Sequence, residues 1–384
     1  MKTDWLSSDD SRWTDVLSQL DHDVYHLPGY VELAAGDEGG CAVAFWAEHD
    51  GDTMLVPLLE RRIPEPLNSD MSLSDATSPY GYPAVLLTPG ADLPRFLAAM
   101  SDAAVERGLV TAFLRLHPLL GLTASDFSGL RRSDSGLKLD ERIVQVEHGQ
   151  TVFVDLTLDE AAQWSQVRSR LRSQIRKLDR DGFGVTWNDW SRYGEFLSIY
   201  EQTMRQVGAS GRYFFGADYF YGLKAALGDR LHLGVVEAPG GSGEMAAAAV
   251  YTEVNGIVEY HLGGTSDAWR RAGPSRLLFD SARRFFGVEG GRVGGRGNRA
   301  LHLGGGLGGG EDSLFRFKAG FSKCRARFTT LRWVFDTEAN DRIESVWRKV
   351  HATDTFEPDF FPRYRQVPPT TLQPDAFDAR PVCS

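Results

Sequence analysis

Residues 231–264 read LHLGVVEAPGGSGEMAAAAVYTEVNGIVEYHLGG, and this stretch decides the fold. It contains three short apolar runs, separated by the segment APGGSG at 238–243 and by Asn255-Gly256. Apolar runs bounded by Gly, Pro and Asn are typical of strands, and Asn-Gly favours a tight hairpin turn. The stretch therefore predicts three consecutive antiparallel strands.

Helical patterns lie on both sides of this predicted meander. Before it, LDEAAQWSQVRSRLRSQIRKLDRDG at 158–182 predicts one long helix, which the strand FGVTW follows. After it, PSRLLFDSARRFFG at 274–287 predicts a helix, RARFTTLRWVF at 325–335 a strand, and 343–351 a last helix. The order of elements over 231–350 resembles the core of GNAT-type N-acyltransferases, so we expect an α/β fold with mixed sheets.

The first half of the chain repeats this alternation. CAVAFWAEHDGDTMLVPLLERR at 41–62 predicts a hairpin turning at Asp50-Gly51, and DLPRFLAAMSDAAVERG at 92–108 predicts an amphipathic helix. RIVQVEHGQTVFVDL at 142–156 predicts a strand pair that turns at His148-Gly149. We therefore expect two GNAT-like domains in tandem, at 1–155 and 156–352, followed by a Pro-rich extended tail at 353–384.

Composition and charge exclude several classes of protein. The 384 residues carry a net charge of −10, which disfavours a general nucleic-acid coat. No apolar run of about 18 residues exists and the N-terminus is polar, so we expect no membrane insertion and a cytoplasmic location. His22 and His26 are four residues apart, but no further ligand has fitting spacing, and we predict no metal site.

A glycine-rich loop precedes a short Phe/Lys segment in HLGGGLGGGEDSLFRFKAGFS, residues 302–322. Its spacing Gly304-x-Gly306-x-x-Gly309 matches a dinucleotide pattern, but Glu311 and Asp312 stand where a phosphate would bind. Those acids are more typical of helix capping. We expect the glycines to keep one wall of the site bare.

Lys318 lies among phenylalanines directly after this loop. Phe317 and Phe321 are four residues apart, a spacing that anchors one side of a helical turn in a core. An ammonium emerging from such an apolar wall would stabilise an oxyanion or a phosphate. The alternative is a surface lysine whose head group remains in water.

The C-terminal segment LHLGGG…EDSLFRFKAGFS resembles the signature of the FemABX-like acyltransferases, which have two GNAT-like domains. Weaker matches are RSRLRSQIRKLDRDGFGVTW at 168–187, SIYEQTMRQVGASGRYFFGADYFYGL at 198–223, GPSRLLFDSARRFFG at 273–287, SPYGYPAVLL at 78–87 and RLHP at 115–118. The similarity extends from about Leu55 to Phe335. One departure is His302, where many members carry an acidic residue.

The resemblance implies an aminoacyltransferase that moves an aminoacyl group from aminoacyl-tRNA to an amine. The acceptor would be a peptidoglycan precursor or a small metabolite, such as one in antibiotic biosynthesis. Aminolysis of an ester needs an aligned amine, a proton acceptor and a cation near the oxyanion, but no covalent nucleophile. We expect no cofactor besides aminoacyl-tRNA as co-substrate, and a monomer.

Candidate site residues follow from the matching segments. Phe317 and Lys318 match the family's aromatic–lysine pair near the tRNA acceptor end, and His302 is the candidate proton acceptor. Either Tyr260 or His261 should face the site, because strand side chains alternate. The candidate substrate-binding residues are Tyr80, Tyr82, Arg115, His117, Arg212, Tyr213 and Tyr260. Packing or loop structure is the alternative role for each of them.

The helix at 168–180 is the main basic concentration in an acidic chain. Arg168, Arg172, Arg176 and Lys177 are therefore the candidate tRNA-binding residues. The alternative is a solvated helix face that pairs with nearby aspartates.

The competing enzyme class is an acyl-CoA-dependent GNAT N-acyltransferase. Arg270-x-x-Gly273-x-Ser275 comes close to the turn that holds the coenzyme A pyrophosphate, but Pro274 removes a backbone donor. A third possibility from another class is an inactive scaffold that binds a protein or glycan.

Overall fold

The computed structural model describes residues 1–69, 72–83, 85–122, 124–128, 142–287, 297–353 and 355–367. The chain forms two compact units: unit 1 comprises Met1–Glu147 and Phe328–Ser384, and unit 2 comprises His148–Arg327. Among the described residues, no helix has the length and apolarity needed to cross a membrane.

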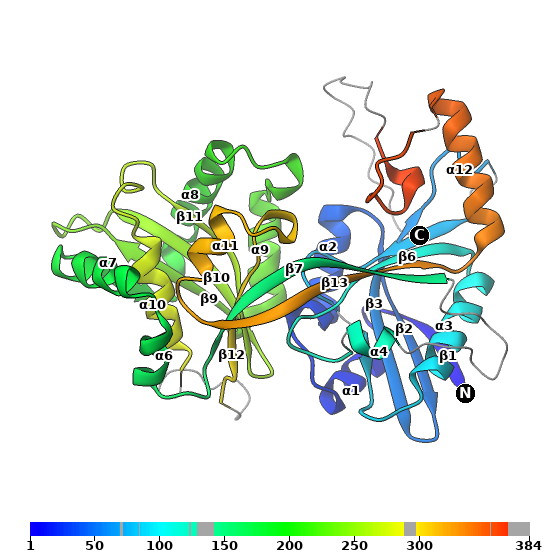
Figure 1. Ribbon diagram of the computed structural model, residues 1–384, viewed down its shortest axis with the longest axis horizontal. Coiled ribbons are helices and arrows are strands. Elements are labelled where there is room, and N and C mark those ends of the chain that lie inside the picture. Colours follow the sequence, from blue (N-terminus) through cyan, green and yellow to red (C-terminus); the bar gives the residue numbers. More distant parts are fainter. Residues whose placement is uncertain are drawn as a thin grey trace. The chain divides into compact units, whose positions relative to one another are not determined.

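The predicted meander forms the centre of the sheet in unit 2 (Figure 1). Asn255 and Gly256 have φ angles of 45° and 80°, as a tight hairpin turn requires. Neighbours in this sheet are antiparallel, except that β11 and β12 are parallel. In spatial order its strands are β8 (Gly184–Trp187), β9 (Leu231–Glu237), β10 (Met245–Val254), β11 (Ile257–Thr265), β12 (Ala300–Gly304) and β7 (Ile143–Asp155).

Helices cover both faces of the unit 2 sheet. One face shares a core with α7 (Ser169–Arg180), α10 (Ser275–Phe285) and α11 (Ser313–Lys318). On the other face, α8 (Tyr193–Gln206) packs so closely that a Cβ at Gly264 would lie 2.8 Å from the Ile199 carbonyl oxygen. α9 (Ala217–Leu227) follows α8 and contacts β9, and α6 (Glu160–Gln166) precedes α7.

Unit 1 follows the same plan. All its strand neighbours are antiparallel except β4 and β6, which are parallel. In spatial order the strands are β1 (Lys2–Ser7), β2 (Cys41–His49), β3 (Asp52–Arg62), β4 (Ser74–Thr77), β6 (Leu109–Arg115) and β13 (Cys324–Val334); β5 (Leu86–Leu87) pairs with β3. The helices are α1 (Ser11–Gln19), α2 (Pro28–Glu38), α3 (Leu93–Glu106), α4 (Ala124–Ser128) and α12 (Thr337–His351).

Two strands, β7 and β13, each pair with a sheet other than that of the strand preceding them in sequence. β7 follows β6 in sequence, yet it pairs with β12 in unit 2. β13 follows β12 in sequence, yet its residues Thr330–Val334 pair with β6 in unit 1. As a result, the described residues 328–353 and 355–367 belong to unit 1, whereas the sequence places 156–352 in one domain.

Two predicted elements differ from the structure. The predicted strand pair at 142–156 is one strand, β7, and Gly149 allows the close approach of the Gly309 carbonyl oxygen instead of a turn. The predicted long helix at 158–182 breaks into α6 and α7, because Val167 and Arg168 adopt extended ψ angles of 129° and 138°.

The C-terminal segment is partly packed, although the sequence predicts an extended tail. Tyr364 is buried and its hydroxyl lies 2.9 Å from the Thr111 hydroxyl. The fully buried carboxylate of Asp75 accepts hydrogen bonds from Arg61 Nε at 2.9 Å and from Arg365 Nε at 2.7 Å. Asp75 therefore joins the tail to β3 and β4 within unit 1.

Replacing Asp75 with Ala is expected to destabilise the protein by about 2 kcal/mol, because two guanidinium groups lose their buried partner. Both arginines keep some water contact, which limits the cost. Urea unfolding followed by tryptophan fluorescence measures the change. Asp359→Asn is the control, since Asp359 is 95% exposed and should contribute less than about 1 kcal/mol. Equal midpoints for the two variants would contradict the assignment.

Candidate functional site

The register of the parallel pair β11–β12 creates the site. The two strands pair only from Ile257↔Ala300 to Glu259↔His302. Beyond this point β11 continues to Thr265 and β12 to Gly304 without pairing with each other. Partners in a parallel pair point to the same face, so Glu259 and His302 lie side by side where the strands separate.

Glu259 and His302 form a buried hydrogen-bonded pair. His302 Nδ1 lies 2.7 Å from Glu259 Oε2 and 3.0 Å from Oε1, and both residues are at most 1% exposed. A carboxylate accepts hydrogen bonds, so Nδ1 carries the proton and donates it to Glu259. The lone pair of His302 is then on Nε2, the arrangement that orients a histidine as a proton acceptor.

Lys318 occupies the point where β11 and β12 separate. Its Nζ donates a hydrogen bond of 2.8 Å to the carbonyl oxygen of Gly305, directly after β12, and lies 5.7 Å from the ring centroid of Tyr260 on β11. The side chain is fixed because α11 begins at a capping residue: Asp312 accepts the Phe315 N–H at 2.8 Å. Lys318 is thus a buried ammonium, not a solvated surface lysine.

Burial lowers the pKa of Lys318 to about 8, although the carboxylates of Asp312 and Glu259 partly oppose this shift. Desolvation disfavours the charged form of an amine, and the nearby negative charges restore only part of its stability. The ammonium therefore remains protonated at neutral pH in surroundings that contain little water.

Gly306 and Gly309 of the loop serve close packing, whereas the sequence predicts glycines that keep a wall of the site bare. A Cβ at Gly306 would collide with Asp312, and a Cβ at Gly309 would lie 2.5 Å from the His148 carbonyl oxygen. Asp312 also accepts the Leu307 N–H at 3.0 Å, so its carboxylate fills the position of the anion in a phosphate-binding loop. This arrangement agrees with helix capping and not with dinucleotide binding.

The aromatic candidates of unit 2 have different surroundings. Phe317 packs edge-on against Phe279 and Phe321, which anchors α11 in the core. Tyr260 also packs on Phe279, and burial raises its pKa to about 12. Tyr213 lies in a 3-10 turn, Gly211–Tyr213, where its carbonyl accepts the Tyr200 hydroxyl at 2.6 Å. Arg212 is in the same turn, and its side chain lies outside the described structure.

Two contacts in unit 2 are not predicted from the sequence. Glu259 was not a candidate, because its partner His302 lies 43 residues away and only the strand register brings them together. His261 contacts the Tyr219 hydroxyl with Nε2 at 2.8 Å. A register shift after Val250 leaves His261 as the extra residue of a bulge, so simple alternation does not hold here.

The candidates of unit 1 gather around a second buried pair. His117 Nδ1 accepts the Leu119 N–H at 3.0 Å, so Nε2 carries the proton and donates to Asp23 Oδ2 at 3.0 Å. The pKa of Asp23 is lowered: burial, the largest single influence, would raise it, but the hydrogen bond and charge interaction with His117, the Val24 N–H and the charge interaction with His26 together outweigh burial. The sequence did not predict Asp23 either. The hydrogen bonds of the Asp23–His117 pair hold the backbone next to these two residues in place.

Of the remaining candidates of unit 1, Tyr82 packs beside this pair. The Tyr82 ring packs edge-on to the rings of His117 and Phe328, with centroids 6.2 Å and 5.3 Å away. Arg115 Nη1 donates to the Ser78 carbonyl oxygen at 2.8 Å. The Tyr80 carbonyl accepts the Tyr30 hydroxyl at 2.9 Å. Unit 1 thus brings together Tyr82 and His117, and places Arg115 on the segment that carries Tyr80.

The predicted basic face of α7 is only partly available. Arg172 donates to the Trp164 carbonyl oxygen at 3.3 Å, and Arg176 stacks over the Trp164 ring. Lys177 pairs with Asp181 at 2.5 Å. Arg168, at the start of the helix, is exposed. In the described structure its guanidinium contacts neither an aromatic ring nor a carboxylate.

The loop that would hold a coenzyme A pyrophosphate is largely satisfied internally. The Gly273 N–H donates to the Arg270 carbonyl at 3.0 Å, and Pro274 has no N–H. The Arg276 N–H donates to the Gly273 carbonyl at 3.2 Å, and the Arg270 guanidinium pairs with Asp267. Few donors of this loop remain for a phosphate.

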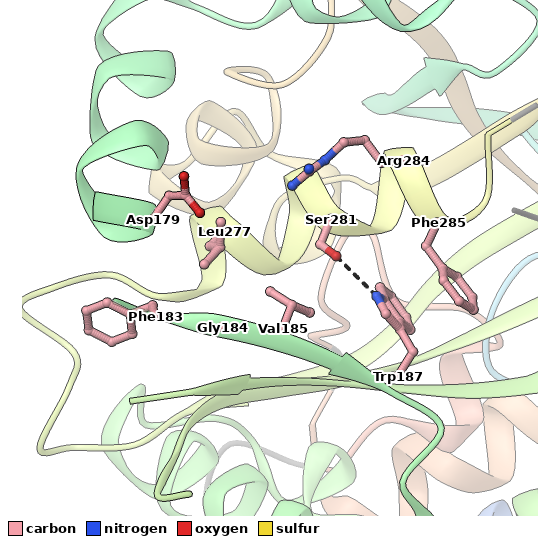
Figure 2. A pocket seen from close by; sticks show the side chains of 9 residues that line it. All are labelled: Asp179, Phe183, Gly184, Val185, Trp187, Leu277, Ser281, Arg284 and Phe285. Carbon is pink, nitrogen blue, oxygen red and sulfur yellow. Dashed lines mark hydrogen bonds between the residues drawn. The ribbon is translucent and has the colours of Figure 1, made fainter. Parts of the chain in front are cut away.

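A pocket of about 410 Å³ lies elsewhere in unit 2, between the end of α7, strand β8 and α10 (Figure 2). Trp187 lines the pocket, stacked on Phe285 and hydrogen-bonded through Nε1 to Ser281 Oγ at 3.1 Å. None of the candidate site residues lines this pocket.

Comparison with known proteins supports the predicted GNAT-like fold. A family model described as acetyltransferase (GNAT) domain matches residues 165–294, so the chain contains a GNAT-type acyltransferase domain. The crystal structure of FemX is similar with a TM-score of 0.66, at 12% identity, covering 90% of this chain and all of FemX. The structure of L-PGS from Bacillus licheniformis has a TM-score of 0.51, at 16% identity, covering 88% of this chain and 96% of that protein. No curated protein sequence matches. The resemblance to FemABX-like proteins is thus confirmed at the level of fold.

Replacing Lys318 with Met should stabilise the protein most at neutral pH. The lowered pKa means that, between about pH 8 and the usual 10.5, the unfolded chain holds a proton that the folded chain lacks. The free-energy cost of burying the charged Lys318 side chain therefore has its full value below about pH 8 and falls to zero as the pH rises toward 10.5.

Urea midpoints of wild type and Lys318→Met at pH 7, 8.5 and 10 measure this dependence. The advantage of the variant should shrink with rising pH, and Lys349→Met reports the effect of losing an exposed lysine. A difference between wild type and Lys318→Met that stays constant over this range would contradict the burial argument.

Proposed function

We propose that this chain is an aminoacyltransferase that transfers an aminoacyl group from aminoacyl-tRNA to the amine of a small metabolite or a peptidoglycan precursor. The observation that carries the proposal is the buried Lys318 ammonium beside the Glu259–His302 pair, where β11 and β12 separate. A donor of this kind would meet the protein in the cytoplasm.

In the proposed reaction the acceptor amine attacks the carbonyl carbon of the aminoacyl ester. The new C–N bond forms as the C–O bond to the ribose breaks, giving an amide and a free ribose hydroxyl. His302 Nε2 takes the proton from the attacking nitrogen, and Glu259 stabilises the imidazolium through the hydrogen bond at Nδ1. The proton then passes to the departing oxygen.

Lys318 would stabilise the negative charge that develops on the carbonyl oxygen and on the departing oxygen. Its ammonium has little water around it, and a cation in a low-dielectric site stabilises such charge more strongly than in water. Phe317 holds the helix that positions this ammonium. The proposed chemistry needs no covalent nucleophile and no cofactor.

A coenzyme A thioester is the alternative donor, since the GNAT domain match is compatible with it. The Arg270–Ser275 loop argues against this donor, because Gly273 and Arg276 use their N–H groups within the loop. The proposal therefore favours a donor that does not bind through a pyrophosphate at this position.

Lys318→Ala is expected to lower kcat for transfer by about 100-fold or more, because a donor to the oxyanion is lost. Wild-type activity should also decline above about pH 8, as Lys318 loses its proton beside Asp312, Glu259 and Tyr260. Lys318→Arg keeps its charge at high pH, so it should lack this decline even if kcat is lower. Turnover of labelled aminoacyl-tRNA against pH measures both effects, and an unchanged alkaline decline in Lys318→Arg would refute the role of Lys318.

Acetyl-CoA should bind weakly or not at all, because the loop offers few free donors. Isothermal titration of the purified protein with acetyl-CoA, and with charged tRNA in parallel, tests the donor class. Restoring a backbone N–H with Pro274→Gly supplies the contrast. Tight binding of acetyl-CoA by the wild type, with no response to tRNA, would favour the alternative donor.

A further inference from the structure

Five arginines of unit 2 surround the start of α7. They come from three parts of the chain that are distant in sequence: the start of α7, the start of α10, and the segment from α11 to β13. All are exposed or half-buried, and we call this group the arginine patch. It consists of Arg168, Arg170, Arg276, Arg316 and Arg325.

Main-chain carbonyls hold four of these guanidinium groups in place, those of Arg168, Arg276, Arg316 and Arg325. Arg276 Nη1 donates to the Gly273 carbonyl at 3.1 Å, and Arg325 Nη1 donates to the Cys324 carbonyl at 2.8 Å. Arg316 Nη1 donates to the Glu311 carbonyl at 2.9 Å. These contacts fix the side chains without a carboxylate at salt-bridge distance, and the Glu311 carboxylate interacts with Arg325 only at longer range.

The patch has an excess of positive charge. Among the described residues, none of its five arginines forms an ion pair. Burial lowers the pKa of Arg276, and the neighbouring charge of Arg170 lowers it further. Burial and the charge of Arg168 act in the same way on Arg325. Like charges therefore lie close together in a chain whose net charge is −10, an arrangement that an anionic ligand would relieve.

The patch is joined to the helix that carries Lys318. The Arg168 N–H donates to the Gly320 carbonyl at 2.9 Å, directly after α11. Arg168 Nη1 also lies 3.5 Å from the carbonyl oxygen of Arg316, which is two residues before Lys318. An anionic chain that lies along the patch would thus have one end near the Lys318 helix.

We propose that the arginine patch binds the phosphodiester backbone of the RNA donor next to its reactive end. This inference rests on the proposed function, and it replaces the α7 face with a surface built from three parts of the chain. Several guanidinium groups spread over a surface match the repeated phosphates of a nucleic acid better than a single anion. Lys177 is excluded from the patch because it pairs with Asp181. Arg172 and Arg176 form a separate group, because both guanidinium groups contact Trp164 of α6.

The test measures binding of an RNA hairpin that carries no amino acid and has a single-stranded 3′ end. Fluorescence anisotropy follows the binding over a range of salt concentrations. The triple variant Arg168→Gln/Arg170→Gln/Arg325→Gln should bind at least about tenfold more weakly, with a salt slope reduced by about three. The corresponding triple Lys variant keeps the charges and should restore most of the affinity, which separates lost charge from misfolding.

Arg205→Gln/Arg230→Gln/Arg284→Gln is the control for net charge: it removes three exposed arginines of unit 2 outside the patch, and two of them, Arg205 and Arg284, pair with Glu201 and Asp280. Equal loss of affinity in this control, or wild-type affinity in the patch variant, would overturn the proposal, as would a wild type that does not bind the hairpin. Binding of the hairpin does not require amino acid transfer. Absence of transfer activity would thus refute the proposed function without refuting RNA binding by the arginine patch. Unchanged hairpin binding by the patch variant would refute the patch without refuting the transfer reaction.

Discussion

The short parallel pairing of β11 and β12 is the constraint on which the candidate site depends. Three residue pairs hold the strands together, and the last of them is Glu259↔His302. If the pairing were one residue out of register, the two side chains would point to opposite faces of the sheet. Because the strands then separate, the Lys318 ammonium reaches a carbonyl after β12 and a ring on β11 at once.

Both units have the same plan of strands. In the described residues, the main strand path of each unit runs through four antiparallel strands, a parallel fifth strand and an antiparallel sixth strand, and β5 adds to β3 of unit 1. The sixth strand of each unit comes from the segment that follows the fifth strand of the other. β13 therefore leads directly from α11, which carries Lys318, into unit 1, so the two units cannot be separated by one cut in the chain.

Charge is used differently in the core and on the surface of unit 2. In the core, Glu259 is paired with His302, and Lys318 is compensated by a carbonyl and nearby carboxylates, as buried ionisable groups require. On the surface around the start of α7, arginines are held by carbonyls and their charge remains. The first arrangement is suited to proton transfer and charge stabilisation, and the second to holding a polyanion.

The sequence by itself determined the local elements and part of the site. Turn residues and apolar runs were sufficient for the meander of β9, β10 and β11, and the Phe spacing placed Lys318 at an apolar wall, because these signals are local in the chain. Tertiary structure alone decided the partners. The register that joins Glu259 to His302, the close contact that makes Gly149 part of one strand, and the exchange of β7 and β13 all depend on segments far apart in sequence. Burial of Lys318 and the grouping of the arginine patch have the same origin, since desolvation and charge proximity exist only after those segments pack together.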